Sequence, residues 1–142
     1  MRYESQTDRN NETAVIASYA SMRGLNAIKM PERYFGDYAL CEERGYILEY
    51  VEVKCRNIGR LDFDTINISL LKCLRMLDLA EASRVPFTLL YRFKDGGLYK
   101  REVTRDDMGK VMQMWGRKNV RDDQEIEPCV LIPSDGFVSI DE

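Results

Sequence analysis

The chain has 142 residues, of which 44% are hydrophobic; this is enough to build one core, and we expect residues 1–142 to form a single domain. No stretch approaches the roughly 20 apolar residues of a membrane-spanning helix, and the N-terminal residues show no apolar signal core, so we expect a soluble protein of the cytoplasm. The formal net charge of -3 argues mildly against a nucleic-acid partner, and four scattered cysteines without a Cys-x-x-Cys pair, in a chain without histidine, argue against a zinc site.

The predicted elements begin with a helix over residues 10–23, which has polar capping residues in front and ends at Gly24. Its apolar positions follow helical spacing and are Val15, Ile16, Tyr19 and Met22. Two short strands follow, over residues 26–30 and 37–40, separated by a break at Pro31.

The third predicted strand, over residues 46–55, is the longest and carries apolar residues on both faces, so we expect it to be central in a sheet. Side chains alternate along a strand, so Glu52 and Lys54 point to one face while Val51 and Val53 point to the other. If the strand bearing Asp37 is its hairpin neighbour, Asp37, Glu52 and Lys54 converge.

The second half of the chain continues the alternation of helix and strand. Residues 56–67 are predicted to be a polar loop, and Ser69 is predicted to cap a helix with an apolar face. We then expect a hairpin of residues 86–93 and 98–103 with a glycine turn, a third helix from Asp106 to Trp115 and a last strand over residues 129–132. The predicted order is αβββαββαβ.

Charge is unevenly distributed. Residues 1–53 hold 6 Lys and Arg against 9 Asp and Glu, residues 54–121 hold 15 against 8, and residues 122–142 hold 0 against 7. The basic middle offers phosphate contacts, for which we select Arg56, Arg60 and Lys72. Ordinary solvated charges explain the same count equally well.

The convergent carboxylates have the chemistry of a magnesium site. Magnesium prefers hard oxygen ligands and is typically held by one or two carboxylates together with substrate phosphates. Asp37 and Glu52 fit this requirement, and the carbonyl of Val53 lies between them in sequence. Lys54 is placed to hold or deprotonate an attacking water or to neutralise developing charge. Glu12, assigned to a different helix face from Val15 and Tyr19, is a further candidate for a direct or water-mediated ligand.

Each of these residues has a plainer interpretation. A Glu-x-Lys triplet often reflects alternating charges on a solvent-facing strand, although a strand flanked by apolar residues is expected to be buried. Asp37 follows a glycine and is also typical of a turn. A glutamate near a helix N-terminus, such as Glu12, is also stabilised by the helix dipole. A lysine on a helix, such as Lys72, is also typical of a solvent-exposed helix surface. The four cysteines are scattered, which indicates free and mostly buried thiols.

With the order helix-Glu, strand-Asp, strand-Glu-x-Lys, helix, strand, the chain resembles the PD-(D/E)XK nuclease superfamily. Within it, the chain is most similar to small Holliday junction resolvases of archaeal type and to phage VRR-type nucleases. The residues that carry the resemblance are Glu12, Gly36-Asp37, Glu52-Val53-Lys54, Ile68–Lys72 and Pro86–Phe93. Gly36 replaces the proline of the motif, and Lys72 stands where some relatives carry glutamine.

The resemblance implies a restriction-endonuclease-like α/β fold, in which helices flank a mixed sheet. Its αβββαβ core would carry an added hairpin strand, a helix and a C-terminal strand. Asp37 and Glu52 would be ligands of Mg²⁺ or Mn²⁺, Lys54 the catalytic lysine and Glu12 an auxiliary acid. The resemblance further implies a phage protein that acts on DNA in the host cytoplasm.

Three functions remain open. The first is a magnesium-dependent endonuclease that cuts branched DNA such as Holliday junctions, which would imply a homodimer with two active sites. The second is a nuclease of the same fold that acts on flaps, forks or plain duplex. The third is a non-catalytic DNA-binding or virion-structural protein, which a retained Glu52 and Lys54 disfavour because buried charges are costly to keep.

Overall fold

The computed structural model describes residues 6–34, 36–109, 112–115 and 127–140. The helices and strands, in chain order, are α1 (Gln6–Arg23), β1 (Asn26–Lys29), β2 (Tyr38–Cys41), β3 (Ile47–Cys55), β4 (Thr65–Ser69), α2 (Leu70–Ser83), β5 (Phe87–Arg92), β6 (Leu98–Val103), β7 (Met112–Trp115), β8 (Glu127–Pro133) and β9 (Val138–Ser139). Short 3-10 turns lie at Glu32–Tyr34, Arg105–Asp107 and Ser134–Gly136.

The strands form two sheets. The larger has the order β1-β2-β3-β5-β6-β9, and the smaller has the order β4-β8-β7. In the larger sheet β3 and β5 run parallel, whereas the other neighbouring pairs are antiparallel. Parallel neighbours need a crossover connection, and here β4 and α2 supply it. The mixed sheet and its central β3 confirm the predicted α/β architecture.

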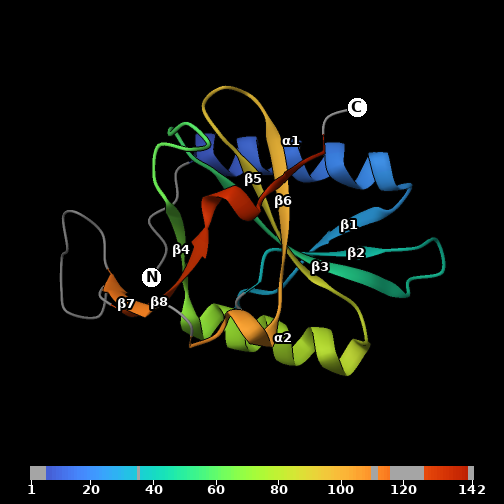
Figure 1. Cartoon of the computed structure of the whole chain (residues 1–142). Coiled ribbons are helices and arrows are strands. Elements are labelled where there is room, and N and C mark those ends of the chain that lie inside the picture. Colours follow the sequence, from blue (N-terminus) through green and yellow to red (C-terminus); the bar gives the residue numbers. More distant parts are fainter. Residues whose placement is uncertain (1–5, 35, 110–111, 116–126, 141–142) are drawn as a thin grey trace.

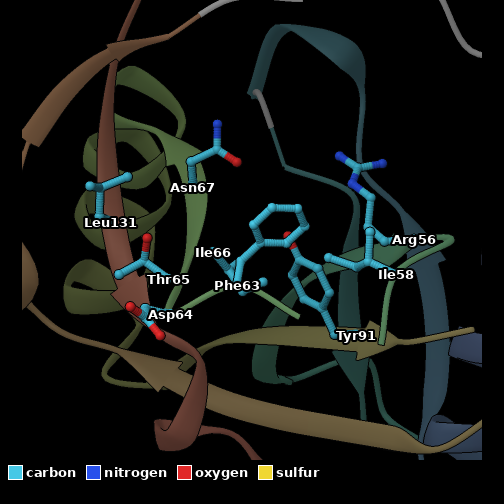
Figure 2. A pocket seen from close by; sticks show the side chains of 9 residues that line it. All are labelled: Arg56, Ile58, Phe63, Asp64, Thr65, Ile66, Asn67, Tyr91 and Leu131. Atoms are coloured by element: carbon cyan, nitrogen blue, oxygen red, sulfur yellow. The ribbon is translucent and has the colours of Figure 1, made fainter. Parts of the chain in front are cut away.

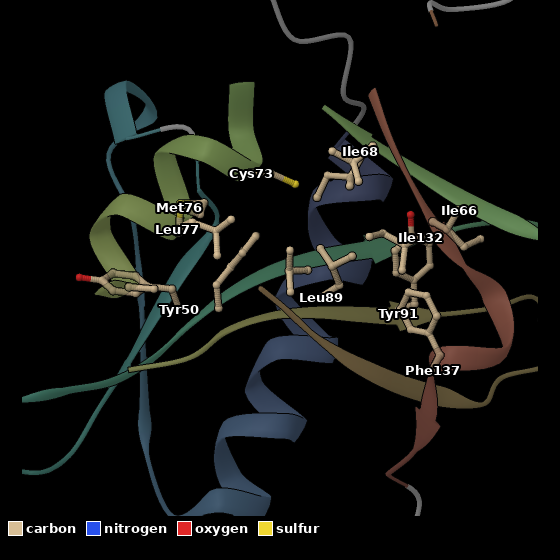
Figure 3. Close-up of a cluster of buried hydrophobic side chains, with 14 of the residues drawn as sticks. Tyr50, Ile66, Ile68, Cys73, Met76, Leu77, Leu89, Tyr91, Ile132 and Phe137 are labelled. Atoms are coloured by element: carbon tan, nitrogen blue, oxygen red, sulfur yellow. The ribbon is translucent and has the colours of Figure 1, made fainter. Parts of the chain in front are cut away.

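Helices cover both faces of the larger sheet, with α1 on one face and α2 on the other (Figure 1). Burial of the apolar side of each helix against the sheet produces two cores. On the α1 face, Val15 and Tyr19 pack with Val51 and Val53. The α2 face carries the cluster that Figure 3 shows, in which Tyr50 is one of the sheet residues packed around α2.

The predicted alternation along β3 is confirmed. Val51 and Val53 lie in the core under α1, while Tyr50 belongs to the core under α2. Glu52 and Lys54 lie two and four residues after Tyr50, so their side chains point to the same face of the sheet as Tyr50, toward α2.

Two local signals at helix ends are also confirmed, although α1 begins at Gln6 and not at residue 10 as predicted. Gly24 follows α1 with a φ of +68°, a conformation that favours glycine, and the Ser69 hydroxyl accepts a hydrogen bond from the Lys72 backbone N–H at 3.3 Å. One assignment on α1 is wrong, because Met22 is 47% exposed and does not join the apolar face.

The predicted third helix is wrong over the residues that the structure describes. Arg105–Asp107 forms only a 3-10 turn, and Met112–Trp115 is strand β7; Val111 lies outside the described residues. Gly109, with a φ of +80°, interrupts the helical path after the first turn. Pairing of β7 with β8 then makes an extended backbone the favoured state.

The predicted polar loop of residues 56–67 is wrong at its end, where Thr65–Ser69 forms β4. Ile66 and Ile68 alternate into the core, and β4 pairs with β8 over sixty residues away along the chain. The cysteines match the prediction: Cys41, Cys73 and Cys129 are buried, and all four thiols are free. Among the described helices, none has the length and apolar character needed to cross a membrane.

Candidate active site

Glu52 is the centre of a charged cluster on the α2 face of the sheet. Its side chain is 0% exposed. Lys72 of α2 donates a hydrogen bond to Glu52 Oε2 at 2.7 Å, and the Lys54 Nζ lies 3.3 Å from the same oxygen. Burial alone would raise the pKa of the Glu52 carboxyl, but the two ammonium groups outweigh it and hold this pKa below its usual range. Glu52 is therefore kept ionised inside the protein.

Asp37 precedes β2 and faces the same part of β3. Its Oδ2 accepts the backbone N–H of Val53 at 2.8 Å, and the carboxylate is 3% exposed. Burial, followed by repulsion from the Glu52 carboxylate, raises the pKa of Asp37 above its ordinary value. The Glu52 carboxylate thus lies close enough to disfavour the charge on Asp37, which is the condition that a cation between them would relieve.

The backbone next to Asp37 is closely packed. Gly36 stands where the motif has proline, and a Cβ at this position would overlap the Sδ and Cε atoms of Met76. Because Met76 is buried in the core under α2, a larger residue here would require that side chain to move. Glycine thus lets the chain bearing Asp37 approach α2.

Val53 occupies the position between the two catalytic candidates of β3. The N–H and C=O of one strand residue point to the same side of the strand, and the Val53 N–H points at Asp37. The Val53 carbonyl is therefore directed to the strand edge where the Asp37 carboxylate lies, beyond the last pair of the β2–β3 ladder at Tyr38 and Val51.

The donor set fits a divalent cation. Glu52 Oε1 is buried and has no hydrogen-bond partner, whereas buried carboxylate oxygens are normally satisfied. This open oxygen, the Asp37 carboxylate and the Val53 carbonyl are all hard oxygen donors of the kind that magnesium and manganese prefer. Among the described residues, no three His, Cys, Asp or Glu side chains gather closely enough to hold a metal, so substrate phosphates and water would complete the coordination.

Glu12 lies on α1, at the opposite face of the sheet from α2. Glu12 is buried, and so are Val15, Ile16 and Tyr19. These three residues follow Glu12 by three, four and seven positions, which places all four on the same face of α1. The prediction that Glu12 occupies a different helix face from Val15 and Tyr19 is therefore wrong. The three-carboxylate set that would have included Glu12 is not found in the described part of the chain.

The three predicted DNA-contacting residues have different surroundings. Lys72 is bound to Glu52 and belongs to the charged cluster itself. Arg56 is exposed at the end of β3 and lines a pocket. Arg60 packs over the Tyr99 ring at 4.9 Å and donates a hydrogen bond to the Phe137 carbonyl at 3.0 Å. The charged cluster thus contains Lys72, and Arg56 lies near the cluster, just after the end of β3.

Two residues near the cluster were missed by sequence reasoning. Lys29 of β1 places its Nζ 3.9 Å from Asp37 Oδ1. Tyr91 of β5 stands beside Lys54 in the parallel register. Burial raises the pKa of the Tyr91 hydroxyl to about 12, with Arg56, Glu52 and Lys72 close enough to modulate it. Only the strand register, which local sequence does not reveal, brings these side chains to the site.

Comparison with known proteins agrees with this geometry. A family model described as "Phage putative PDDEXK endonuclease" matches residues 1–140. No curated protein matches the chain. The mixed sheet flanked by α1 and α2 is consistent with the restriction-endonuclease-like fold, and nucleases of this type generally use divalent metals. The chain belongs to the phage PDDEXK endonuclease family.

Proposed function

We propose that this nuclease is a Mg²⁺-dependent endodeoxyribonuclease that hydrolyses phosphodiester bonds, with Mn²⁺ as a substitute metal. The observation that carries the proposal is Glu52, a fully buried carboxylate that stays ionised between two lysines and keeps one oxygen without a hydrogen-bond partner. A site that served only the fold would satisfy that oxygen. Asp37 beside it supplies a second carboxylate, and magnesium is typically held by one or two carboxylates together with substrate phosphates.

The side chains divide the chemistry between them. Asp37, Glu52 and the Val53 carbonyl would hold the cation, which when bound supplies Lewis-acid stabilisation of the charge that develops on the phosphate. Lys54 keeps part of its side chain in solvent and orients a water or transfers a proton at the attacking oxygen. Lys72 fixes the Glu52 carboxylate and adds positive charge toward the scissile phosphate.

Glu12, Arg56 and Arg60 have supporting roles in this proposal. Glu12 is buried on α1 and would act as an auxiliary acid through water rather than as one of three gathered ligands. Arg56 is exposed and would contact phosphate directly. The Arg60 guanidinium is engaged by Phe137 and Tyr99, so its contribution to DNA binding would come mainly from its charge.

We propose branched DNA, in particular a four-way junction, as the preferred substrate in the host cytoplasm. Paired incisions across a junction need two active sites, so the same proposal includes a homodimer. The test is cleavage of a four-way junction, a flap, a fork and a linear duplex of shared sequence, each with Mg²⁺ and with Mn²⁺. Light scattering of the protein with and without junction DNA measures the oligomeric state.

Faster cutting of the junction by a dimer supports the proposal, and Glu52→Gln serves as the inactive control. Equal cutting of junction and duplex would contradict the preference for branched DNA. Preference for flaps or forks would replace the junction with those substrates. If no DNA is cut with either metal, the non-catalytic alternative stands instead.

A further inference from the structure

A pocket of about 290 Å³ opens beside the charged cluster, at the junction of the two sheets. Figure 2 shows the aromatic rings of Phe63 and Tyr91 in the middle of its lining, with Arg56 to one side and Asn67 to the other. Phe63 is 59% exposed although it is large and apolar. An exposed aromatic ring at the mouth of a pocket is typical of a binding site rather than of a core.

Arg56 and Tyr91 connect the pocket to the proposed active site, whose carboxylates and lysines do not themselves line it. Glu52 and Lys54 point to one face of β3, and Arg56, the residue after its end, continues this alternation because its backbone N–H still donates to the Arg92 carbonyl of β5. Successive members of this series are separated by about 6.6 Å, twice the rise of a strand residue. Tyr91 stands beside Lys54 in the β3–β5 register and lines the pocket. The distance from the cluster to the pocket is thus on the scale of one or two nucleotides.

The pocket lining separates apolar faces from polar edges. The exposed ring of Phe63, with Ile58 and Leu131, offers flat and apolar contact, whereas the Tyr91 ring lines the pocket from within the core and is 2% exposed. Thr65 and Asn67 offer hydrogen-bonding groups near those rings. A nucleobase has this combination of an aromatic face and a hydrogen-bonding edge, and bases commonly stack on aromatic side chains in single-stranded recognition.

The charges around the pocket determine how a nucleotide would enter. Asp64 is an exposed residue of the pocket lining and disfavours an anion beside it, since like charges repel. Arg56 lies at the side nearer to Lys54 and offers a cation to a phosphate outside. A nucleotide would therefore insert its base and leave its phosphate toward Arg56 and the Lys54 side of the cluster.

We propose that this pocket binds one unpaired nucleobase next to the phosphate that is cut. The proposal rests on the nuclease function proposed above and narrows its substrate class to DNA with an unpaired nucleotide near the cleavage site. Stacked and paired bases of an intact duplex cannot enter the pocket unless they are first extruded, which costs a few kcal/mol. Nucleotides left unpaired at branch points avoid that cost.

The test compares Phe63→Ala with the wild type on two DNA branches that differ at one position. One branch carries an unpaired 2-aminopurine next to the cleavage site, and the other carries an abasic sugar there. Binding is measured in EDTA, so that no metal-dependent cutting occurs. We expect 2-aminopurine fluorescence to fall on binding, and Phe63→Ala to remove that quenching and weaken binding by about 5- to 100-fold.

The abasic branch separates base recognition from other effects. We expect Phe63→Ala to have little effect on its binding, because no base is present to stack on the ring. Leu61→Ala is the matched control, since Leu61 is 65% exposed and does not line the pocket, and it should behave as the wild type. Equal losses on both branches, or unchanged fluorescence with the wild type, would overturn the proposal.

Failure of the nuclease proposal gives a different result. If the wild type cuts no DNA with Mg²⁺ or Mn²⁺ but still quenches 2-aminopurine in a Phe63-dependent manner, the base pocket stands and the catalytic function fails. If it cuts DNA while quenching is absent, the base pocket fails alone. Thermal melting of Phe63→Ala and Leu61→Ala verifies that both variants are folded.

Discussion

Strand β3 carries two buried glutamates on opposite faces of the sheet, and their surroundings differ sharply. Glu49 faces α1 and is 2% exposed. Its Oε2 accepts hydrogen bonds from the Tyr19 hydroxyl at 2.9 Å and the Thr88 hydroxyl at 2.5 Å, and its Oε1 is paired with Arg23. Glu52 faces α2, is paired with Lys54 and Lys72, and retains an unsatisfied oxygen.

These different surroundings indicate two roles for a buried carboxylate, one in stabilising the fold and one in catalysis. A carboxylate whose oxygens are all satisfied by neutral hydroxyls and an arginine contributes to the fold, because its desolvation is offset by hydrogen bonds. A carboxylate with an open oxygen, a second carboxylate nearby and lysines beside it is a candidate for chemistry. We therefore expect substitutions at Glu52 to affect cleavage and substitutions at Glu49 to affect stability.

The largest expected effect is on cleavage by Glu52→Gln. The amide cannot replace the charged metal ligand, so several kcal/mol of transition-state stabilisation are lost, and cleavage falls by about 1,000-fold or more. The free energy of unfolding changes far less than the cleavage rate, because the loss of the buried ion pairs is partly offset when Asp37 loses the repulsion of the Glu52 carboxylate. Single-turnover cleavage and urea unfolding measure the two effects; activity near the wild-type level would show that Glu52 is not a ligand.

Lys54→Met should lower the rate of cleavage by about 100-fold, since it removes the group that orients or deprotonates the attacking water. Binding of DNA in EDTA should change far less, because one charge among several is lost. Lys94→Met is a matched control, as Lys94 is exposed and lies 4.0 Å from Asp62, away from the cluster. Equal rates for Lys54→Met and Lys94→Met would contradict the catalytic assignment of Lys54.

Glu49→Gln should lower the free energy of unfolding by about 2 kcal/mol, because hydrogen bonds to a buried charged group are weakened. The loss is moderated because the Arg23 side chain is 38% exposed and can be solvated. Cleavage per folded molecule should stay at the wild-type level. A variant that melts normally but cuts poorly would place Glu49 in the active site and remove the contrast between the two faces.

The smallest effect concerns alkaline pH. Burial, with the Glu49 carboxylate second, raises the pKa of Tyr19 from 10.0 to about 12. The folded protein therefore holds this proton more tightly than the unfolded chain, so the stabilisation is complete below pH 10 and is lost as the pH rises toward 12. Tyr19→Phe should reduce the loss of stability between pH 10 and pH 12, measured by unfolding at each pH. An identical profile for the variant would show that Tyr19 does not cause the loss.

The residues around β3 show how far sequence can predict this site. Alternation along the strand placed Glu52 and Lys54 on one face, and the cap at Ser69 marked the start of α2; both are local patterns that survive folding. The pairing of Lys72 with Glu52 depends on how α2 crosses the sheet. The way in which α2 crosses the sheet is determined by tertiary packing. The only indication of this ion pair in the sequence was therefore a lysine in the first turn of the helix.

The smaller sheet marks the limit of local reasoning. Apolar spacing over residues 108–115 predicted a helix, yet Met112–Trp115 pairs with β8. The pairings of β8 with β4 and β7 bring together distant segments, whose mutual hydrogen bonds override weak local preferences. The pocket beside Phe63 was missed for the same reason, because its lining comes from the segment between β3 and β4, from β4 itself, and from β5 and β8.

The most direct test of the metal site is thermal unfolding of the wild type, Asp37→Asn, Glu52→Gln and Glu49→Gln with increasing Mn²⁺. Ligand that binds only the folded state raises its stability with concentration. We predict a rising melting temperature for the wild type and for Glu49→Gln, and no rise for Asp37→Asn or Glu52→Gln. A wild type that does not respond to Mn²⁺, or a Glu52→Gln variant that responds as the wild type does, would contradict the metal site at Asp37 and Glu52.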